Sequence, residues 1–408
     1  MDAVSVVVIG AGPAGLAVSG SLVAAGVGHV VLERHDVGHA WRHQRWDSLR
    51  TLTPNWMNGL PRLAYRGPDP DGYMTAAELA DRLDGYASSV AGPVVTGVEV
   101  AAVRPGRRGH LVEADVGSWA ADAVVLATGP GETDIPAVAA DLPCSLRQVS
   151  AAGYRNPGQL GDRVLVVGAS ASGVQIADEV VRSGRRVTLA VGEHVRLPRT
   201  YRGRDILWWM QAMGVSSRRW DDDLADLTRA RHVPSPQLIG APDRTLDLRT
   251  LREQGVQLVG RLVGVREGRL QLSGSLANLV ANADLKQARL LDQIDEFIVD
   301  VGVAALGPDR PPATVVDTPP TSVDLAAFDT VLWATGNRYT PPRLDPAHLD
   351  RRGRILHDGG LLRAPGLFAI GLPFLRRRSS TFLSGIGRDA VELSIEIRRH
   401  LDRAAVAA

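Results

Sequence analysis

Two glycine-rich turns, beginning at Gly10 and Gly168, constrain the fold of this chain more than any other feature. Residues 4–9, VSVVVI, form a continuous apolar and β-branched run, which predicts a strand buried on both faces. The turn GAGPAG follows, and then a helical stretch over 16–25. The strand at 163–167, the turn GASASG and the helical stretch at 174–182 repeat this order. The repeat predicts an α/β fold with two Rossmann-like dinucleotide-binding domains.

The first turn has the residue types that an adenine dinucleotide needs. Gly10 permits the tight turn, Gly12 lets the backbone approach a pyrophosphate, and Gly15 lets the helix pack closely on the sheet. Glu33 stands at the end of the next strand, where its carboxylate can accept both ribose hydroxyls. A chance glycine turn is the alternative. The residues that we expect to bind the cofactor here are Gly10, Gly12, Pro13, Ala14, Gly15, Glu33 and Arg34.

The second turn has serine at the middle glycine position, where its hydroxyl can donate to a phosphate oxygen. The following strand ends at Val191-Gly192 without an acid, and two arginines come soon after. A carboxylate there would repel a 2′-phosphate, whereas arginine would bind it in a bidentate manner. This favours NADPH over NADH, although both arginines could simply be solvated loop residues. The residues that we expect to bind NADPH are Gly168, Ser170, Ser172, Gly173, Arg196 and Arg199.

Composition excludes several other classes of protein. A formal net charge of +1 argues against a dedicated nucleic-acid binder. The single cysteine, Cys144, allows no intrachain disulfide, no CxxC pair and no cysteine-rich zinc site. No apolar run approaches the roughly 18 residues that cross a bilayer. No histidine pair has metal-ligand spacing with an acid, so no metal site is expected. The sequence thus predicts a cytoplasmic protein that does not act at a membrane.

The motifs taken together resemble a known family. GAGPAG, GASASG and the ATG tripeptides at 127–129 and 334–336 are similar, in this order, to the motifs of class B flavin monooxygenases. That family includes the flavin-containing monooxygenases, the plant YUCCA-type enzymes and bacterial flavoprotein relatives. The resemblance covers nearly the whole chain and extends to stretches such as WDSLRTLTPNWMNGLP and RRRSSTFLSGIGRDA.

The resemblance implies FAD and NADPH as cofactors, and O2 and a small organic molecule as substrates. In the family NADPH reduces the flavin, O2 adds at flavin C4a, and one oxygen atom passes to the substrate. It further implies that Trp41 lies beside the FAD and that Asn55 holds the flavin adduct, although Asn55 could equally be a turn residue after Pro54. The expected cofactor-binding residues also include the ATG links between the nucleotide domains, which are Thr128, Gly129, Thr335 and Gly336. A plain strand ending is the alternative interpretation of each link.

The last helix offers one more candidate contact with the flavin. Gly385 and Ile386 precede a helical stretch over 389–400, and a helix N-terminus aimed at the flavin would stabilise negative charge in the reduced ring. An ordinary glycine-rich helix start is the alternative reading of the same residues.

One departure from the family pattern keeps a second function open. The histidine of the Baeyer–Villiger fingerprint, aligned on Tyr154, is replaced by Ser150. The alternative is therefore an NADPH-dependent flavoprotein reductase or oxidase without stable oxygen transfer. A non-enzymatic dinucleotide-binding module is a third hypothesis.

For domain organisation, we expect an FAD-binding domain made of residues 1–158 and 326–408. An NADPH-binding domain over 159–325 is inserted into it, with a helical insertion at about 200–305. The sequence leaves the oligomeric state open, a homodimer being one alternative.

Overall fold

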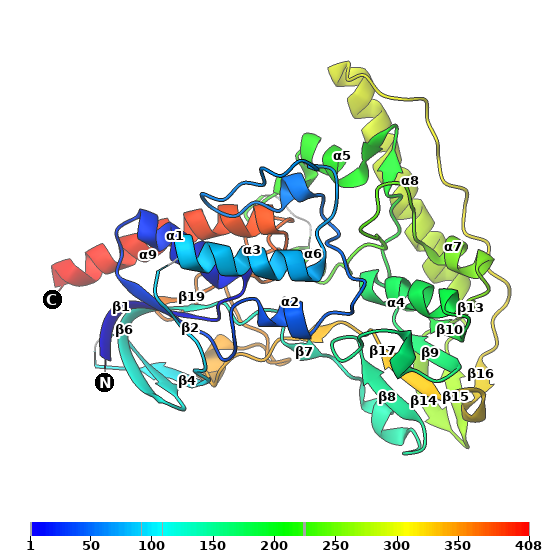
Figure 1. The fold of residues 1–408 in the computed structure, drawn as a ribbon, viewed down its shortest axis with the longest axis horizontal. Coiled ribbons are helices and arrows are strands. Elements are labelled where there is room, and N and C mark those ends of the chain that lie inside the picture. Colours follow the sequence, from blue (N-terminus) through cyan, green and yellow to red (C-terminus); the bar gives the residue numbers. More distant parts are fainter. Residues whose placement is uncertain (1, 91, 108, 223–225, 408) are drawn as a thin grey trace.

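The computed structural model describes residues 2–90, 92–107, 109–222 and 226–407. Two separate sheets, each with helices against it, form two halves that lie side by side in Figure 1. The first sheet has the order β3-β2-β1-β6-β5-β4, with β19 added on β6, and the second has the order β13-β10-β9-β17-β8. The predicted α/β fold with two Rossmann-like sheets is therefore confirmed.

The first half contains both termini of the chain. Its strands are β1 (Asp2–Ile9), β2 (His29–Leu32), β3 (Val94–Val95), β4 (Val100–Pro105), β5 (His110–Ala114), β6 (Gly117–Leu126) and β19 (Leu367–Ala369). Its helices are α1 (Pro13–Ala24), α2 (His39–His43), α3 (Ala76–Ser89) and α9 (Leu383–Ala407). β1 runs parallel to β2 on one side and to β6 on the other.

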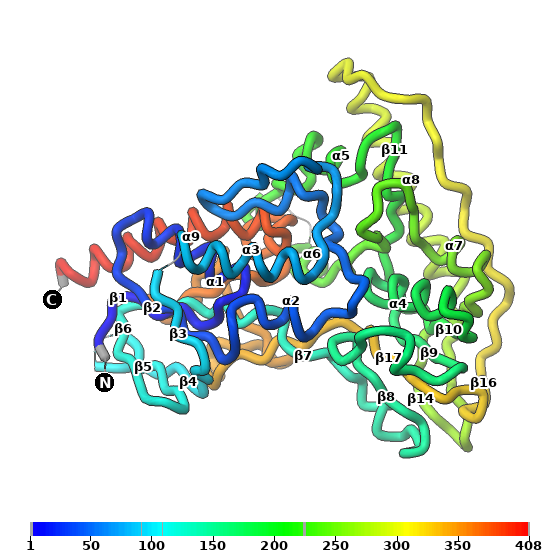
Figure 2. Tube along the Cα trace, viewed as in Figure 1, coloured from blue at the N-terminus to red at the C-terminus, as the bar shows by residue number. Residues whose placement is uncertain are grey.

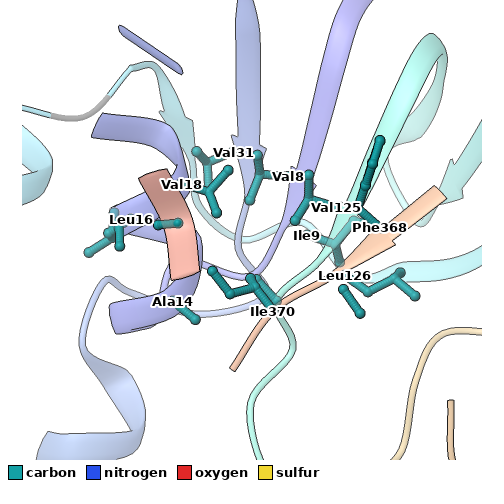
Figure 3. Close-up of a cluster of buried hydrophobic side chains, with 14 of the residues drawn as sticks. Val8, Ile9, Ala14, Leu16, Val18, Val31, Val125, Leu126, Phe368 and Ile370 are labelled. Carbon is teal, nitrogen blue, oxygen red and sulfur yellow. The ribbon is translucent and has the colours of Figure 1, made fainter. Parts of the chain in front are cut away.

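The apolar run of β1 is buried because helices and strands cover both of its faces. Val6, Val7 and Val8 are fully buried. Figure 3 shows Val8 and Ile9 beside Val125 of β6 and near the side chains of α1. The same view places Ile370, just after β19, next to Ala14, so the C-terminal part of the chain reaches the first glycine turn. Thr75 and Glu78 form a capping box at the start of α3.

The second half is built around β9 and the second glycine turn. Its elements are β8 (Arg147–Ser150), β9 (Arg163–Val167), α4 (Ala171–Arg182), β10 (Arg186–Ala190), α7 (Leu248–Glu253), β13 (Gln257–Val259) and β17 (Thr330–Trp333). All pairings in this sheet are parallel, and the central strands are continuous apolar runs. That pattern is typical of a sheet covered on both faces.

The strand pairing groups two segments differently from the expected domain boundaries. β8 and β17 pair with each other and lie in the second sheet, although 158 and 326 would leave both in the first domain. The chain instead crosses between the halves at two links that pair as an antiparallel ribbon, β7 (Glu132–Thr133) with β18 (Asn337–Arg338). Figure 2 shows these two segments running together between the halves. Local sequence patterns do not reveal this grouping, because strand membership is decided by long-range pairing.

The expected helical insertion is likewise only partly helical. It contains β11 (Thr200–Tyr201), β12 (Arg204–Asp205), α5 (Ile206–Ala212), α6 (Leu227–Arg231) and α8 (Leu276–Val301). However, β13 pairs with β10 at the edge of the second parallel sheet. β14 (Leu262–Arg266) pairs with β15 (Arg269–Leu272), which pairs with β16 (Ser322–Asp324). In the described part of the chain, no helix is long and apolar enough to span a membrane.

Candidate functional site

The first glycine turn has the shape of an anion-binding cradle. Gly10 has a φ of +106°, and a Cβ on it would lie 2.5 Å from the Ala127 carbonyl oxygen. A Cβ on Gly15 would lie 1.9 Å from the Gly10 carbonyl oxygen, whereas one on Gly12 would meet nothing within 4 Å. α1 begins directly after Gly12, with no side-chain cap and no acid in its first turn. The free amides of a helix N-terminus therefore face open space, which fits a pyrophosphate.

Glu33 stands against this turn. Its Oε2 accepts a hydrogen bond from the Ala11 amide at 2.6 Å, and its Oε1 accepts one from the His35 amide at 2.9 Å. These two bonds fix the carboxylate beside the turn, and the remaining lone pairs can accept ribose hydroxyls. Arg34 forms an exposed ion pair with Glu99 at 3.5 Å. Its expected contact with the cofactor stays a prediction.

The second turn has nearly the same backbone geometry as the first. Gly168 has a φ of +107°, and a Cβ on it would lie 2.3 Å from the Ala334 carbonyl oxygen. A Cβ on Gly173 would lie 1.8 Å from the Gly168 carbonyl oxygen. Ser170 is the N-cap residue of α4, yet its side chain makes no capping bond, and the neighbouring Ser172 is half-buried in the first turn of the helix. The Ser170 hydroxyl is therefore not used as a cap, and its expected contact with a ligand phosphate stays a prediction.

Arg196 and Arg199 do not stand where the sequence analysis expects them. Arg196 is 2% exposed and forms ion pairs with Asp247 at 2.8 Å and Asp284 at 2.7 Å. Arg199 is 1% exposed and is paired with Asp205 at 2.6 Å. Both guanidinium groups are already neutralised in the interior, so neither can bind a 2′-phosphate.

Arg199 instead joins the two halves of the molecule. Its Nη1 donates to the Leu52 carbonyl at 3.0 Å, while Asp205 also accepts a bond from the Tyr73 hydroxyl at 2.7 Å. Burial raises the pKa of Tyr73, so this hydroxyl stays protonated and continues to donate. Leu52 and Tyr73 belong to the long loop of the first half, and Asp205 caps α5 of the second.

Arg261 is the residue that the sequence analysis missed. It follows β13, which runs parallel to β10, and its side chain is exposed. Its Nε and Nη2 atoms lie 3.7 and 3.8 Å from the position of a Cβ on Gly192, at the strand end that lacks an acid. Only the pairing of β13 with β10 brings this arginine there, and a sequence pattern does not show that pairing.

The ATG links hold the crossing segments together. The Thr128 hydroxyl donates to the Tyr339 hydroxyl at 2.9 Å, and the Thr335 hydroxyl donates to the Asp134 carbonyl at 2.6 Å. Gly129 and Gly336 have φ values of +73° and +89°, and a Cβ on either would meet nothing within 4 Å. The hydroxyls thus have structural partners, and a direct contact of these four residues with a cofactor stays a prediction.

Asn55 and Trp41 lie in the part of the first half that faces the second. Trp41, in α2, packs against the hydrophobic cores of both halves. Asn55 begins the short 3-10 helix η1 (Asn55–Met57) and is 6% exposed. Its Nδ2 donates to the Asp69 carbonyl at 2.9 Å, while its Oδ1 is buried without a partner among the described residues. A buried acceptor left unpaired costs about 1–3 kcal/mol. The expected contact of Asn55 with a flavin adduct stays a prediction.

The last helix begins earlier than predicted, because α9 starts at Leu383 and not at Asp389. Gly385 and Ile386 therefore lie within its first turn, both buried. A Cβ on Gly385 would lie 1.9 Å from the Ser379 carbonyl oxygen, so glycine is required for the preceding loop to pack here. Burial raises the pKa of Asp389 to about 6, although Arg377 beside it acts in the opposite direction.

Comparison with known proteins agrees with this geometry. Residues 7–204 match the family model described as pyridine nucleotide-disulphide oxidoreductase. An uncharacterized CzcO-like oxidoreductase of Geobacillus kaustophilus is 30% identical over 404 residues, which cover 97% of this chain and 99% of the relative. The chain belongs to the flavin monooxygenase/CzcO-like family. Indole-3-pyruvate monooxygenase YUCCA1 of Oryza sativa is 32% identical, with 98% of this chain and 93% of the relative covered.

Solved structures support the same fold. A flavin-containing monooxygenase from Stenotrophomonas maltophilia has a TM-score of 0.69 at 23% identity, with 98% of this chain and 99% of that chain covered. A bacillithiol disulfide reductase from Staphylococcus aureus has a TM-score of 0.60 at 11% identity, with 99% of each chain covered. Family membership makes this protein a flavin-dependent oxidoreductase that binds FAD and NAD(P)H.

The contrast between Gly12 and Gly15 separates cofactor binding from folding. Gly12→Val should leave the stability of the FAD-free protein within about 1 kcal/mol, because the new side chain meets only open space. It should weaken FAD binding about 5- to 150-fold, the equivalent of about 1–3 kcal/mol of steric conflict. Gly15→Ala should instead destabilise the FAD-free protein by about 3 kcal/mol. FAD titration and urea unfolding measure the two effects, and full FAD affinity in Gly12→Val would contradict the assignment.

Replacing Arg199 should lower the stability of the protein and leave its affinity for NADPH unchanged. Arg199→Leu leaves the buried Asp205 carboxylate without its cation, which should cost about 3–5 kcal/mol of unfolding free energy. The affinity for NADPH should not change. Arg252→Leu removes an exposed pair with Asp317 and serves as the control, with an expected loss below about 1 kcal/mol. If Arg199→Leu loses NADPH affinity and keeps its stability, the expectation that Arg199 binds the 2′-phosphate of NADPH would be supported instead.

Proposed function

We propose that this protein is an NADPH-dependent monooxygenase that transfers one oxygen atom from O2 to a small organic substrate. The balanced reaction consumes NADPH, one proton and O2, and yields the oxygenated product, NADP+ and water. The observation that carries the proposal is the duplicated strand–turn–helix unit, which provides two dinucleotide sites in one chain. One site suits the flavin and the other the nicotinamide reductant.

Cysteine content favours oxygen transfer over disulfide reduction. Cys144 is the one cysteine of the sequence, and it is exposed. The chain therefore has no dithiol pair of its own to carry electrons from a flavin to a disulfide. In addition, a relative with a monooxygenase name aligns along 98% of this chain, whereas the disulfide reductase above shares the fold at 11% identity.

The FAD would be held by the first turn and by Glu33, for the reasons given above. When bound, FAD accepts a hydride from the nicotinamide and activates O2. The chain contributes binding, orientation and exclusion of water. Asn55 is suited to this task because it is buried and its amide keeps free hydrogen-bonding capacity. Its Oδ1 has no partner among the described residues, and its Nδ2 uses one hydrogen for the bond to Asp69. Preorganised hydrogen bonds of this kind need no reorganisation during the reaction.

NADPH would be held by the second turn, with Arg261 as the residue that distinguishes it from NADH. The adenosine ribose of a dinucleotide lies at the end of the strand after the crossover helix. That place is Val191-Gly192, where Arg261 lies, and the acid that follows, Glu193, is paired with Lys286 at 3.4 Å. A guanidinium group at this point can bind a 2′-phosphate.

Removing Asn55 should uncouple NADPH oxidation from oxygen transfer. Losing one preorganised hydrogen bond costs on the order of 3–4 kcal/mol by comparison with oxyanion-hole donors. Asn55→Ala should therefore keep NADPH oxidation and release most of the oxygen as hydrogen peroxide. Asn58→Ala is the control from the same loop, because the Asn58 amide is engaged with Thr51 and Thr53. An unchanged ratio of peroxide to NADPH in Asn55→Ala would remove Asn55 from the site.

Arg261→Gln should weaken NADPH binding while NADH binding stays the same. A hydrogen-bonded charge contact is worth about 1.5–3 kcal/mol, or about 10- to 150-fold in affinity. Arg266→Gln, an exposed arginine of the neighbouring β14, should have no effect. The dissociation constants of both nucleotides are measured for each variant. Equal weakening of NADPH and NADH would show that Arg261 does not recognise the 2′-phosphate.

A reductase or oxidase is the second candidate, and one observation favours it. Ser150 stands at the end of β8, and its hydroxyl accepts a bond from the Gly153 amide at 3.1 Å. A short hydroxyl in that position cannot replace a histidine as a proton carrier near neutral pH. Near-complete conversion of O2 to hydrogen peroxide by the unmodified enzyme, across a broad panel of substrates, would decide in favour of this candidate.

A further inference from the structure

The segment between β19 and α9, residues 370–382, lies at the ligand-binding edge of the first sheet. β19 runs parallel to β6, so the chain leaves both strands at the carboxyl edge, which is where doubly wound sheets bind their ligands. A Cβ on Gly371 would lie 3.0 Å from the Cβ of Ala14, in the first turn of α1. Glu33, which suits the adenosine ribose, stands at the end of β2, on the other side of β1. The flavin end of a dinucleotide on the first turn would therefore extend toward β6 and this segment.

Residues 216–220 of the second half run antiparallel to this segment and pair with it. Three backbone hydrogen bonds join them: the Trp220 amide donates to the Arg376 carbonyl at 3.1 Å, the Arg378 amide to the Arg218 carbonyl at 3.0 Å, and the Ser379 amide to the Ser216 carbonyl at 3.1 Å. Arg219 and Arg377 form an antiparallel bridge between them. The second half thus contributes a backbone edge to a loop of the first half.

The side chain of Trp220 reinforces this pairing. The guanidinium groups of Arg219 and Arg376 lie 4.7 and 5.3 Å from its ring centroid, which is within the range of cation–π attraction. The Trp220 Nε1 donates to the Asp358 carboxylate at 2.6 Å. Gly359 has a φ of +51°, and a Cβ on it would lie 2.5 Å from Cζ2 of the indole, so the ring fills the space beside this glycine. Groups from both halves therefore hold the half-buried indole.

An ion-pair network connects the same contact to α9. Arg376 is 5% exposed, its Nε donates to the Gly359 carbonyl at 2.7 Å, and its Nη1 donates to Glu392 at 3.1 Å. Arg219 of the second half pairs with the same carboxylate at 3.1 Å, and Arg377 pairs with it as well. One acid of α9 therefore neutralises arginines from both halves, and such a partly buried network fixes the arrangement of its members.

The backbone of the segment is strained, so contacts from outside must hold its conformation. Phe374 is 4% exposed and has a φ of +45°, a left-handed conformation that non-glycine residues rarely adopt. Such a residue persists only where the surrounding structure over-determines it. In addition, a Cβ on Gly385 would lie 1.9 Å from the Ser379 carbonyl oxygen, so the start of α9 packs directly on the paired stretch. A shift of residues 376–379 would therefore move both Phe374 and the start of α9.

We propose that Trp220 is a positioning residue for the flavin end of FAD. From the second half, it holds residues 370–382, and through them the start of α9, in the conformation that borders the flavin. The adenosine end, at Glu33, lies on the other side of β1 and does not depend on this contact. The second half thereby helps to hold the flavin, in addition to binding the reductant. This inference rests on the part of the proposed function that places FAD on the first turn.

A comparison of FAD with ADP separates the two ends of the cofactor. ADP contains the adenosine and the diphosphate without the flavin, and its competition with FAD, measured on the full-length protein after removal of FAD, gives a dissociation constant without turnover. Trp220→Ala should weaken FAD binding about tenfold, because cation–π contacts and a hydrogen bond are lost, and should leave ADP binding unchanged. Trp220→Phe keeps a ring beside both arginines and should retain FAD affinity within about threefold. The visible circular dichroism of the bound flavin should change in Trp220→Ala and not in Trp220→Phe.

Trp208→Ala is the matched control. Trp208 is half-buried in the same half and also has a guanidinium group against its ring, that of Arg204 at 4.2 Å, but it lies outside residues 216–220. Its replacement should change neither dissociation constant. If Trp220→Ala does not fold, Arg219→Gln removes one of the two cations and should weaken FAD about threefold while ADP binding stays the same.

Three results would overturn this assignment. They are unchanged FAD affinity in Trp220→Ala, equal weakening of FAD and ADP, which would show a purely structural role, and the same effect in Trp208→Ala. A wrong placement of FAD is detected separately, because Gly12→Val would then keep full FAD affinity. None of these measurements uses oxygen transfer, so the role of Trp220 can be confirmed even if the monooxygenase proposal fails.

Discussion

In each half of the molecule the first helix rests directly on the carbonyl oxygen of the first glycine in its turn. A Cβ on the last glycine of either motif would lie within 2 Å of that oxygen, so no other residue allows the helix to pack so closely. This contact places the open N-termini of α1 and α4 at the carboxyl edges of their sheets. Because anions are stabilised at such helix ends, both dinucleotide sites depend on this packing.

The two sites become one enzyme only through the links between the halves. The ribbon of β7 and β18 connects them covalently, and the buried Arg199–Asp205 pair joins the Leu52–Tyr73 loop to α5. Buried ion pairs add little to net stability, but they fix a particular arrangement because removing one partner is costly. Here that arrangement places η1, residues 215–217 and the start of α9 around one small cavity.

Local signals in the sequence were sufficient for the elements around each turn. The apolar runs at β1, β9 and β17, the glycine spacing and the capping box of α3 all describe contacts between near neighbours in the chain. Predictions that depended on long-range pairing failed. β8 and β17 belong to the second sheet, and Arg196 and Arg199 turned inward because Asp247, Asp284 and Asp205 come from distant segments. Arg261 could not be found because its relevance depends on the pairing of β13 with β10.

The proposed activity requires that one atom of O2 enter an organic product at the expense of NADPH. Turnover under 18O2, with the products analysed by mass spectrometry, measures this directly for a panel of organic acids and of nitrogen and sulfur nucleophiles. We expect a product that carries one 18O atom and is formed in proportion to the NADPH consumed. NADPH consumption with all the label recovered as hydrogen peroxide, and none in any product of the panel, would contradict it.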